Sequence, residues 1–192
     1  MNQKTKPAQH PMSGIAFNLM RMVMSLRKRF RNIDKEIGLA GLKPGDVVLD
    51  FGCGLGFNTI PAAQQVGSRG KVYALDVNPS AIAIVEKKMR KHGLDNIEML
   101  ISDCNIPLED QTVDIVYLHN TLPLITRKKE VLREIWRVLK VHGNLSYMSR
   151  KLSRATGDVT MKDQDVREYL ETELHCQLVL EDNGHFIFER KQ

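Results

Sequence analysis

Residues 47–57 read VVLDFGCGLGF and contain the strongest indication of the fold class. Residues 47–51 have the apolar composition of a buried central strand, and glycines follow at positions 52, 54 and 56. Glycine permits a tight turn and lets backbone N–H groups approach a ligand that a Cβ would keep away. Phe57 stands where a dinucleotide-binding GxGxxG turn has its third glycine. No Lys-Ser or Lys-Thr pair follows, so the stretch is not a phosphate-binding P-loop.

On both sides of this turn, strand-like and helix-like segments alternate. Apolar periodicity predicts helices at 13–39, 58–66, 80–92, 128–139 and 162–174. Short apolar runs predict further strands at 71–76, 97–101, 113–118 and 144–149. Near the end, residues 177–180 and 185–189 flank Asp182-Asn183-Gly184, which is typical of a hairpin turn. The alternation predicts an α/β fold, a parallel sheet with helices on both faces that ends in an antiparallel hairpin.

Three acidic residues follow the ends of successive strands. Asp50 precedes the glycines, Asp76 ends the second strand, and Asp103 follows the third. A carboxylate at the Asp76 position can accept both ribose hydroxyls of an adenosine, and Asp103 is placed to accept from an adenine amine. An edge with three acids repels a pyrophosphate and favours an adenosine that carries a cation.

These residues carry a resemblance to a known family. Residues 48–56 (VLDFGCGLG), 72–76 (VYALD), Asp103 and 132–140 (LREIWRVLK) resemble class I S-adenosylmethionine-dependent methyltransferases, nearest to the branch with quinone C-methyltransferases. The resemblance implies a Rossmann-like αβα sandwich whose seven-stranded sheet has the order 3-2-1-4-5-7-6 and an antiparallel last strand. It also implies S-adenosylmethionine as methyl donor, S-adenosylhomocysteine as product, and no metal. The cofactor-binding residues it implies are Asp50, Gly52, Cys53, Gly54, Gly56, Asp76, Val77, Asp103 and Cys104. Val141-His142-Gly143 departs from the family's Pro-Gly-Gly turn.

The segment after the fourth strand supplies candidates for the acceptor side. Tyr117, His119 and Asn120 lie at the carboxyl end of that strand, where an acceptor would approach. His119 is a candidate base because an unperturbed imidazole titrates near neutral pH. The Asn/Asp-Pro-Pro-Tyr/Phe pattern of methylases that act on DNA bases is absent, so a nucleic-acid substrate is not expected.

Charge is unevenly placed along the 192 residues. The net charge is +5, but residues 1–43 carry +7 and the rest −2. We therefore expect two parts: a basic amphipathic N-terminal helix (1–40), acting as a lid or an assembly element, and a cofactor-binding domain (41–192). No run of about 18 apolar residues occurs, although peripheral membrane contact remains open. The odd number of cysteines, without CxxC spacing, predicts a reducing cytoplasm.

We therefore interpret the protein as an enzyme that transfers a methyl group from S-adenosylmethionine to a small acceptor, which is apolar or anionic. Two alternatives remain: a non-catalytic partner subunit that binds an adenosine cofactor, and an NAD-dependent oxidoreductase, which Phe57 disfavours. The sequence leaves open whether the protein is a monomer or a homodimer, and which acceptor atom is methylated.

Overall fold

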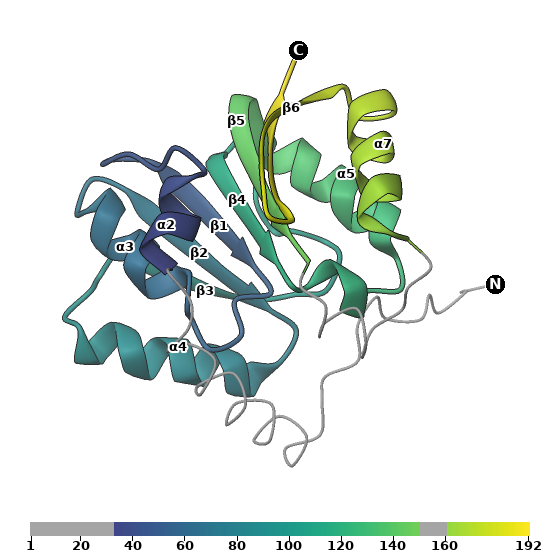
Figure 1. The fold of residues 1–192 in the computed structure, drawn as a ribbon. Helices are drawn as coiled ribbons and strands as arrows, with labels where there is room; N and C mark the ends of the chain where they lie inside the picture. The colour runs from purple at the N-terminus through teal and green to yellow at the C-terminus, as the bar shows by residue number, and fades with distance from the viewer. Residues whose placement is uncertain (1–32, 150–160) are drawn as a thin grey trace.

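A seven-stranded sheet with helices on both faces organises the described residues, 33–149 and 161–192, of the computed structural model (Figure 1). The expected helix 13–39 lies mostly outside these residues, and its described end is α2, Ile33–Gly38. The further helical segments are α3 (Thr59–Val66), α4 (Pro79–Lys91), η1 (Leu122–Leu124), α5 (Lys128–Val138) and α7 (Asp163–Thr172). The strands are β1 (Val47–Phe51), β2 (Lys71–Asp76), β3 (Ile97–Ile101), β4 (Val113–His119), β5 (Leu139–Met148), β6 (Cys176–Asp182) and β7 (His185–Arg190).

The strand order is β3-β2-β1-β4-β5-β7-β6. Neighbours from β3 to β5 pair in parallel, whereas β7 runs antiparallel to both β5 and β6. Asn183 and Gly184, both with positive φ, form the turn between β6 and β7. The predicted α/β fold and the strand order implied by the resemblance are therefore confirmed.

The strand predicted at 144–149 begins earlier, at Leu139. Leu139 pairs with Val113, and the register then shifts between Val113 and Ile115. Within the irregular stretch His142 has a φ of 64°, and a Cβ on Gly143 would lie 2.9 Å from two backbone carbonyl oxygens. The segment Val141-His142-Gly143 is thus an irregular part of β5 rather than a separate turn, which the apolar pattern could not indicate.

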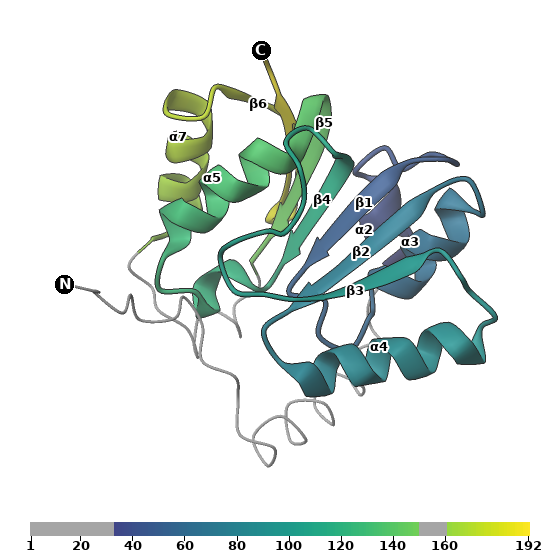
Figure 2. The same cartoon turned by 180° about the vertical axis from the view of Figure 1, so that it is seen from behind.

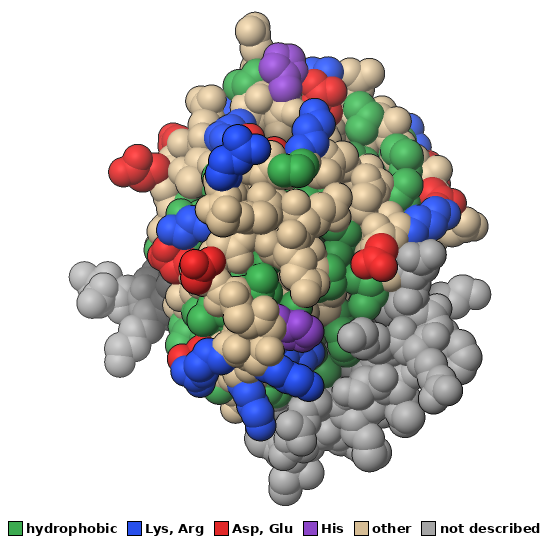
Figure 3. Space-filling model, turned by 90° about the vertical axis from the view of Figure 1, so that its left-hand side faces the viewer, with side chains coloured by type: hydrophobic (Ala, Val, Ile, Leu, Met, Phe, Trp, Pro, Cys, Tyr) green, Lys and Arg blue, Asp and Glu red, His purple; other side chains and the backbone are tan. Residues whose placement is uncertain are grey.

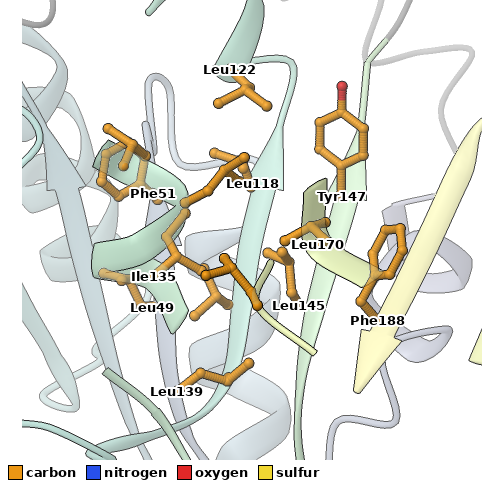
Figure 4. Packing of buried hydrophobic residues seen from close by; sticks show 14 of the residues in the cluster. Leu49, Phe51, Leu118, Leu122, Ile135, Leu139, Leu145, Tyr147, Leu170 and Phe188 are labelled. Carbon is orange, nitrogen blue, oxygen red and sulfur yellow. The ribbon is translucent and has the colours of Figure 1, made fainter. Parts of the chain in front are cut away.

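The sheet separates two apolar clusters. On one face, Leu118 and Leu145 of the sheet pack with Ile135 of α5 and Leu170 of α7 (Figure 4). On the other face, Val48, Tyr117 and Ile187 belong to a cluster with residues of α2, α3 and α4. The view from behind shows α5 and α7 beside β4 and β5, and α3 and α4 toward β1 to β3 (Figure 2). This packing leaves the carboxyl ends of the parallel strands as the edge where a site can form.

Basic side chains gather at the lower part of the face that carries α3 and α4 (Figure 3). The last turn of α4 carries Lys88, Arg90 and Lys91, whose positive charges suit the negative end of the helix dipole. Of the helices in the described ranges, none combines the length and apolarity needed to cross a membrane.

Candidate functional site

The glycine turn after β1 is tied to β2 and leaves space beside one of its glycines. Gly52 and Cys53 donate their backbone N–H groups to the carbonyl of Leu75 at 2.8 and 2.9 Å. Gly52, Gly54 and Gly56 have φ values of 75°, 51° and 69°. A Cβ on Gly52 would overlap the Thr121 side chain, but one on Gly54 would meet, among residues 33–149 and 161–192, just a carbonyl oxygen at 3.9 Å. Packing thus explains Gly52, whereas the space that these residues leave beside Gly54 suits a ligand that approaches the backbone.

Asp50 lies beneath this turn and is 2% exposed. Its carboxylate accepts hydrogen bonds from Thr59 Oγ1 at 2.5 Å and from Asn58 Nδ2 at 3.5 Å, both at the start of α3. Burial raises the pKa of the Asp50 carboxyl to about 6, against the opposing effect of the hydrogen bonds from Thr59 and Asn58. A cation bound nearby would favour the ionised form, so the buried charge is suited to a positively charged ligand.

Asp76 connects the glycine turn to the start of α4. Its Oδ2 accepts from the backbone N–H of Gly54 at 2.9 Å, and its Oδ1 accepts from that of Asn78 at 2.8 Å. Burial raises the pKa of this carboxyl, and the backbone hydrogen bonds oppose that rise. Each carboxylate oxygen accepts more than one hydrogen bond, so both retain capacity toward ligand hydroxyls. The adjacent Val77 is half-buried.

Asp103 lies beyond the end of β3 in an ion pair that sequence reasoning missed. Arg127 Nη2 lies 3.2 Å from Asp103 Oδ2, and the backbone N–H of Cys104 donates to Oδ1 at 2.6 Å. Arg127 also bonds Glu130 at 2.9 Å, which fixes the guanidinium at the start of α5. No sequence signal joins residues 103 and 127, because the contact arises from the place of α5 beside the β3–β4 connection.

The pairing of strands brings these three acids to one edge. Phe51 pairs with Leu75, and Asp76 pairs with Ile101, so β1, β2 and β3 end at neighbouring levels. Cys53 and Cys104 are also at this edge, both buried. The predicted cofactor residues are thus gathered along the carboxyl ends of three adjacent strands. Within the described ranges, no cluster of His, Cys, Asp or Glu could hold a metal ion.

The three candidates at the end of β4 have different surroundings. Tyr117 is fully buried, and its hydroxyl donates to the carbonyl of Ile37 in α2 at 3.2 Å, so its contacts are those of a core residue. Asn120 is half-buried with a φ of 59°, and its N–H donates to the carbonyl of Met148. His119 is 7% exposed, and its Nε2 lies 2.8 Å from Ser146 Oγ. Sequence reasoning missed Ser146, which no motif marks.

Comparisons with known proteins agree with this geometry. A family model described as "Methyltransferase domain" matches residues 42–191. The chain belongs to the class I S-adenosylmethionine-dependent methyltransferases. This methyltransferase is 28% identical to a ubiquinone/menaquinone biosynthesis C-methyltransferase of Hydrogenovibrio crunogenus, over 98% of the chain and 75% of that relative. It is 33% identical to the protein of the same name in Hahella chejuensis, over 90% of the chain and 69% of the relative.

Comparison with solved structures supports the same family. The methyltransferase matches the crystal structure of a SAM-dependent methyltransferase from Aquifex aeolicus with a TM-score of 0.73 and 27% identity. The match covers 85% of this chain and 92% of the other. S-Adenosylmethionine is therefore the methyl donor, and the family resemblance first noted at residues 48–56 is confirmed.

Proposed function

We propose that the methyl donor binds along the carboxyl ends of β1, β2 and β3. Asp76 would accept from the ribose hydroxyls, the space beside Gly54 would admit the ligand against the backbone, and Asp103 with Cys104 would border the adenine. Gly52, Cys53, Gly56 and Val77 would form the remaining wall. The support is the space that the described residues leave beside Gly54, together with the two carboxylate oxygens of Asp76, both of which accept hydrogen bonds from backbone N–H groups.

We propose a small aromatic acceptor of the quinol type. The observation that carries this is the match over 98% of the chain to a relative named as a quinone-biosynthesis C-methyltransferase. When bound, the donor supplies an electrophilic methyl group on sulfur that already carries its own leaving group. The protein then has to align the acceptor with that methyl, exclude water and accept a proton.

A second relative raises a different acceptor, arsenite. The chain is 32% identical to an arsenite methyltransferase of Halobacterium salinarum over 108 residues, which is 56% of the chain. Binding arsenic through sulfur requires thiolates, and burial raises the pKa of all three thiols, those of Cys53, Cys104 and Cys176. The quinol acceptor is therefore favoured. The free, buried cysteines also support the expectation of a reducing cytoplasm.

We propose His119 as the group that accepts the acceptor's proton, with Asn120 beside it as a contact to the acceptor. His119 is the last residue of β4, and Asn120 begins the loop whose Thr121 side chain lies against Gly52 of the glycine turn. We do not propose Tyr117 as an acceptor contact, because its side chain is buried and its hydroxyl donates to the carbonyl of Ile37 in α2.

The predicted division at residue 40 becomes a proposal as well. The family model begins at residue 42, which supports a cofactor-binding domain over 41–192 and a separate N-terminal element over 1–40. However, α2 is attached to the sheet: Ile37 is fully buried, and Asn144 Nδ2 donates to the carbonyl of Ala40 at 3.0 Å. The first turns of the expected helix, proposed as a lid, lie outside the described residues. Deletion of residues 1–24 keeps the α2 contacts and should leave donor binding intact while turnover falls.

Methyl transfer tests the proposed function directly. The full chain is incubated with S-adenosylmethionine and, in separate reactions, a short-chain demethylmenaquinol, catechol or arsenite, and products are identified by mass. We expect a mass increase of one methylene in the quinol alone, lost in Asp76→Ala and retained in Asp95→Ala, a change at an exposed carboxylate. Methylation of arsenite or catechol but not of the quinol would show that the proposed acceptor class is wrong.

A further inference from the structure

Two buried histidines from different strands both form a hydrogen bond with the hydroxyl of one buried serine. His119 Nε2 lies 2.8 Å from Ser146 Oγ, and His185 Nε2 lies 2.7 Å from the same oxygen. The three residues are 7%, 0% and 4% exposed, respectively. His119 ends β4, Ser146 lies in β5 and His185 begins β7, so three adjacent strands meet at this hydroxyl. We call these residues the His-Ser-His cluster.

Strand pairing fixes the cluster in place. Met148 of β5 pairs with His119 on one side and with His185 on the other, which puts both rings at the same level of the sheet. The ring centroids of the histidines are 5.1 Å apart with an interplanar angle of 85°. The Tyr117 ring, 5.4 Å from that of His119, packs edge-on against the cluster. The rings therefore meet edge to face, and the hydroxyl of Ser146 forms the hydrogen-bonded link between them.

The chemistry of a hydroxyl couples the two rings. A serine hydroxyl has one proton to donate and lone pairs that accept, whereas each nitrogen of a neutral imidazole either donates or accepts. When His185 Nε2 donates to Ser146, the hydroxyl proton can point to His119 Nε2, which places the His119 proton on Nδ1. When the direction is reversed, His119 donates from Nε2 and its Nδ1 becomes the basic nitrogen. The direction of one hydroxyl thus decides which nitrogen of His119 is basic.

We propose that His185 is a positioning residue, which acts through Ser146 to fix the tautomer and ring orientation of His119. This inference rests on the proposed function in so far as His119 accepts the proton of the acceptor. His185 itself does not touch the reacting atoms. Its role is to orient His119 through the hydrogen bonds of Ser146. Catalytic imidazoles are commonly oriented in this way by a third group, which fixes their tautomer.

The coupling is tested by NMR without any acceptor. In protein labelled with ¹⁵N-histidine at pH 8.5, we expect the rings of His119 and His185 to have opposite tautomers, one protonated at Nδ1 and the other at Nε2. Ser146→Ala should abolish this relation, and the exposed His92 should be unaffected. The same tautomer in both rings of the wild type, or no change in Ser146→Ala, would overturn the coupling.

Kinetics with the short-chain demethylmenaquinol then test the link to catalysis. We expect Ser146→Ala and His185→Leu each to lower kcat about tenfold with an unchanged KM for S-adenosylmethionine, and the double variant to be no worse than either single one. His185→Gln, whose amide oxygen can accept the hydroxyl proton as Nε2 of His185 does when Nδ1 of His119 is the basic nitrogen, should recover most of kcat. This variant also covers the case in which His185→Leu fails to fold. Multiplying losses in the double variant, or a raised KM alone, would overturn the positioning role. An unchanged kcat in His119→Gln would instead refute the proposed base, while leaving the NMR result to stand or fall separately.

Discussion

Asp50→Asn tests the claim that a buried negative charge is kept at this site for a cationic ligand. The amide has the shape of the carboxyl, and both hydrogen-bonding neighbours, Thr59 and Asn58, can reorient to pair with it. The substitution therefore removes the charge with little change in packing.

The expected effect on stability follows from the pKa of Asp50. Burial raises this pKa from 3.8 to about 6, so ionising the carboxyl costs about 3 kcal/mol more in the folded than in the unfolded protein. In this pH range the folded state binds more protons than the unfolded state, so the contribution of Asp50 to the free energy of unfolding falls as pH rises from about 4 to about 6. At pH 7.5 the full penalty is present, and Asp50→Asn should raise the free energy of unfolding by about 1–3 kcal/mol.

The expected effect on binding has the opposite sign. At an effective dielectric constant of about 20, opposite charges about 10 Å apart attract by about 1.7 kcal/mol. Because S-adenosylmethionine carries a sulfonium charge that S-adenosylhomocysteine lacks, Asp50→Asn should weaken binding of the former about twentyfold relative to binding of the latter. Urea unfolding of both proteins between pH 4.5 and 8, with calorimetric titrations of both ligands, measures the two effects. A variant that is less stable at pH 7.5 and keeps the ratio of the two affinities would show that the charge of Asp50 neither destabilises the fold nor attracts the cationic ligand.

Three further substitutions test other parts of the structure. Asp76→Ala should weaken S-adenosylhomocysteine by about 1.5–3 kcal/mol in calorimetry, since the lost bonds involve a charged acceptor, and an unchanged Kd would remove Asp76 from the site. Gly54→Ala should lower the free energy of unfolding by about 1 kcal/mol and weaken the binding of S-adenosylhomocysteine at least tenfold. Gly52→Ala, whose Cβ overlaps Thr121, should lower the Tm more than Gly54→Ala does. A larger drop in Tm for Gly54→Ala, with unchanged binding, would show that the cofactor does not approach the backbone at Gly54. His142→Gly should raise the free energy of unfolding by about 0.5–1 kcal/mol, because a left-handed φ of 64° is strained for any residue that has a Cβ. A lower Tm in this variant would show that the hydrogen bond between His142 and Glu189 stabilises the fold more than the strain destabilises it.

The sequence predicted most of the fold because the apolar runs and the glycine turn are local signals. The hairpin at Asp182-Asn183-Gly184 was predicted for the same reason. The early start of β5 was missed, since it depends on pairing with Val113 and on a left-handed residue, neither of which has a periodic signature.

For the candidate site, the sequence predicts the location of three acids but not their function. Asp50, Asp76 and Asp103 lie at one edge because each is at or just after the end of a strand and parallel strands end at the same edge; their contact with the cofactor stays a prediction. The position of Tyr117 near the end of β4 predicts a contact with the acceptor. However, successive side chains of a strand point to opposite faces, and that of Tyr117 points into the core, where its hydroxyl donates to the Ile37 carbonyl of α2. Arg127, Ser146 and His185 were missed because their partners are 24, 27 and 39 residues away in the chain, and tertiary packing alone unites them.

Calorimetric titration of the full chain at pH 7.5 with S-adenosylhomocysteine and, separately, with NAD tests whether the methyl donor binds along the ends of β1 to β3. We expect one site per chain for S-adenosylhomocysteine with a Kd in the micromolar range, and no heat with NAD. Saturable binding of NAD, or no binding of S-adenosylhomocysteine to the folded protein, would show that this edge is not the donor site.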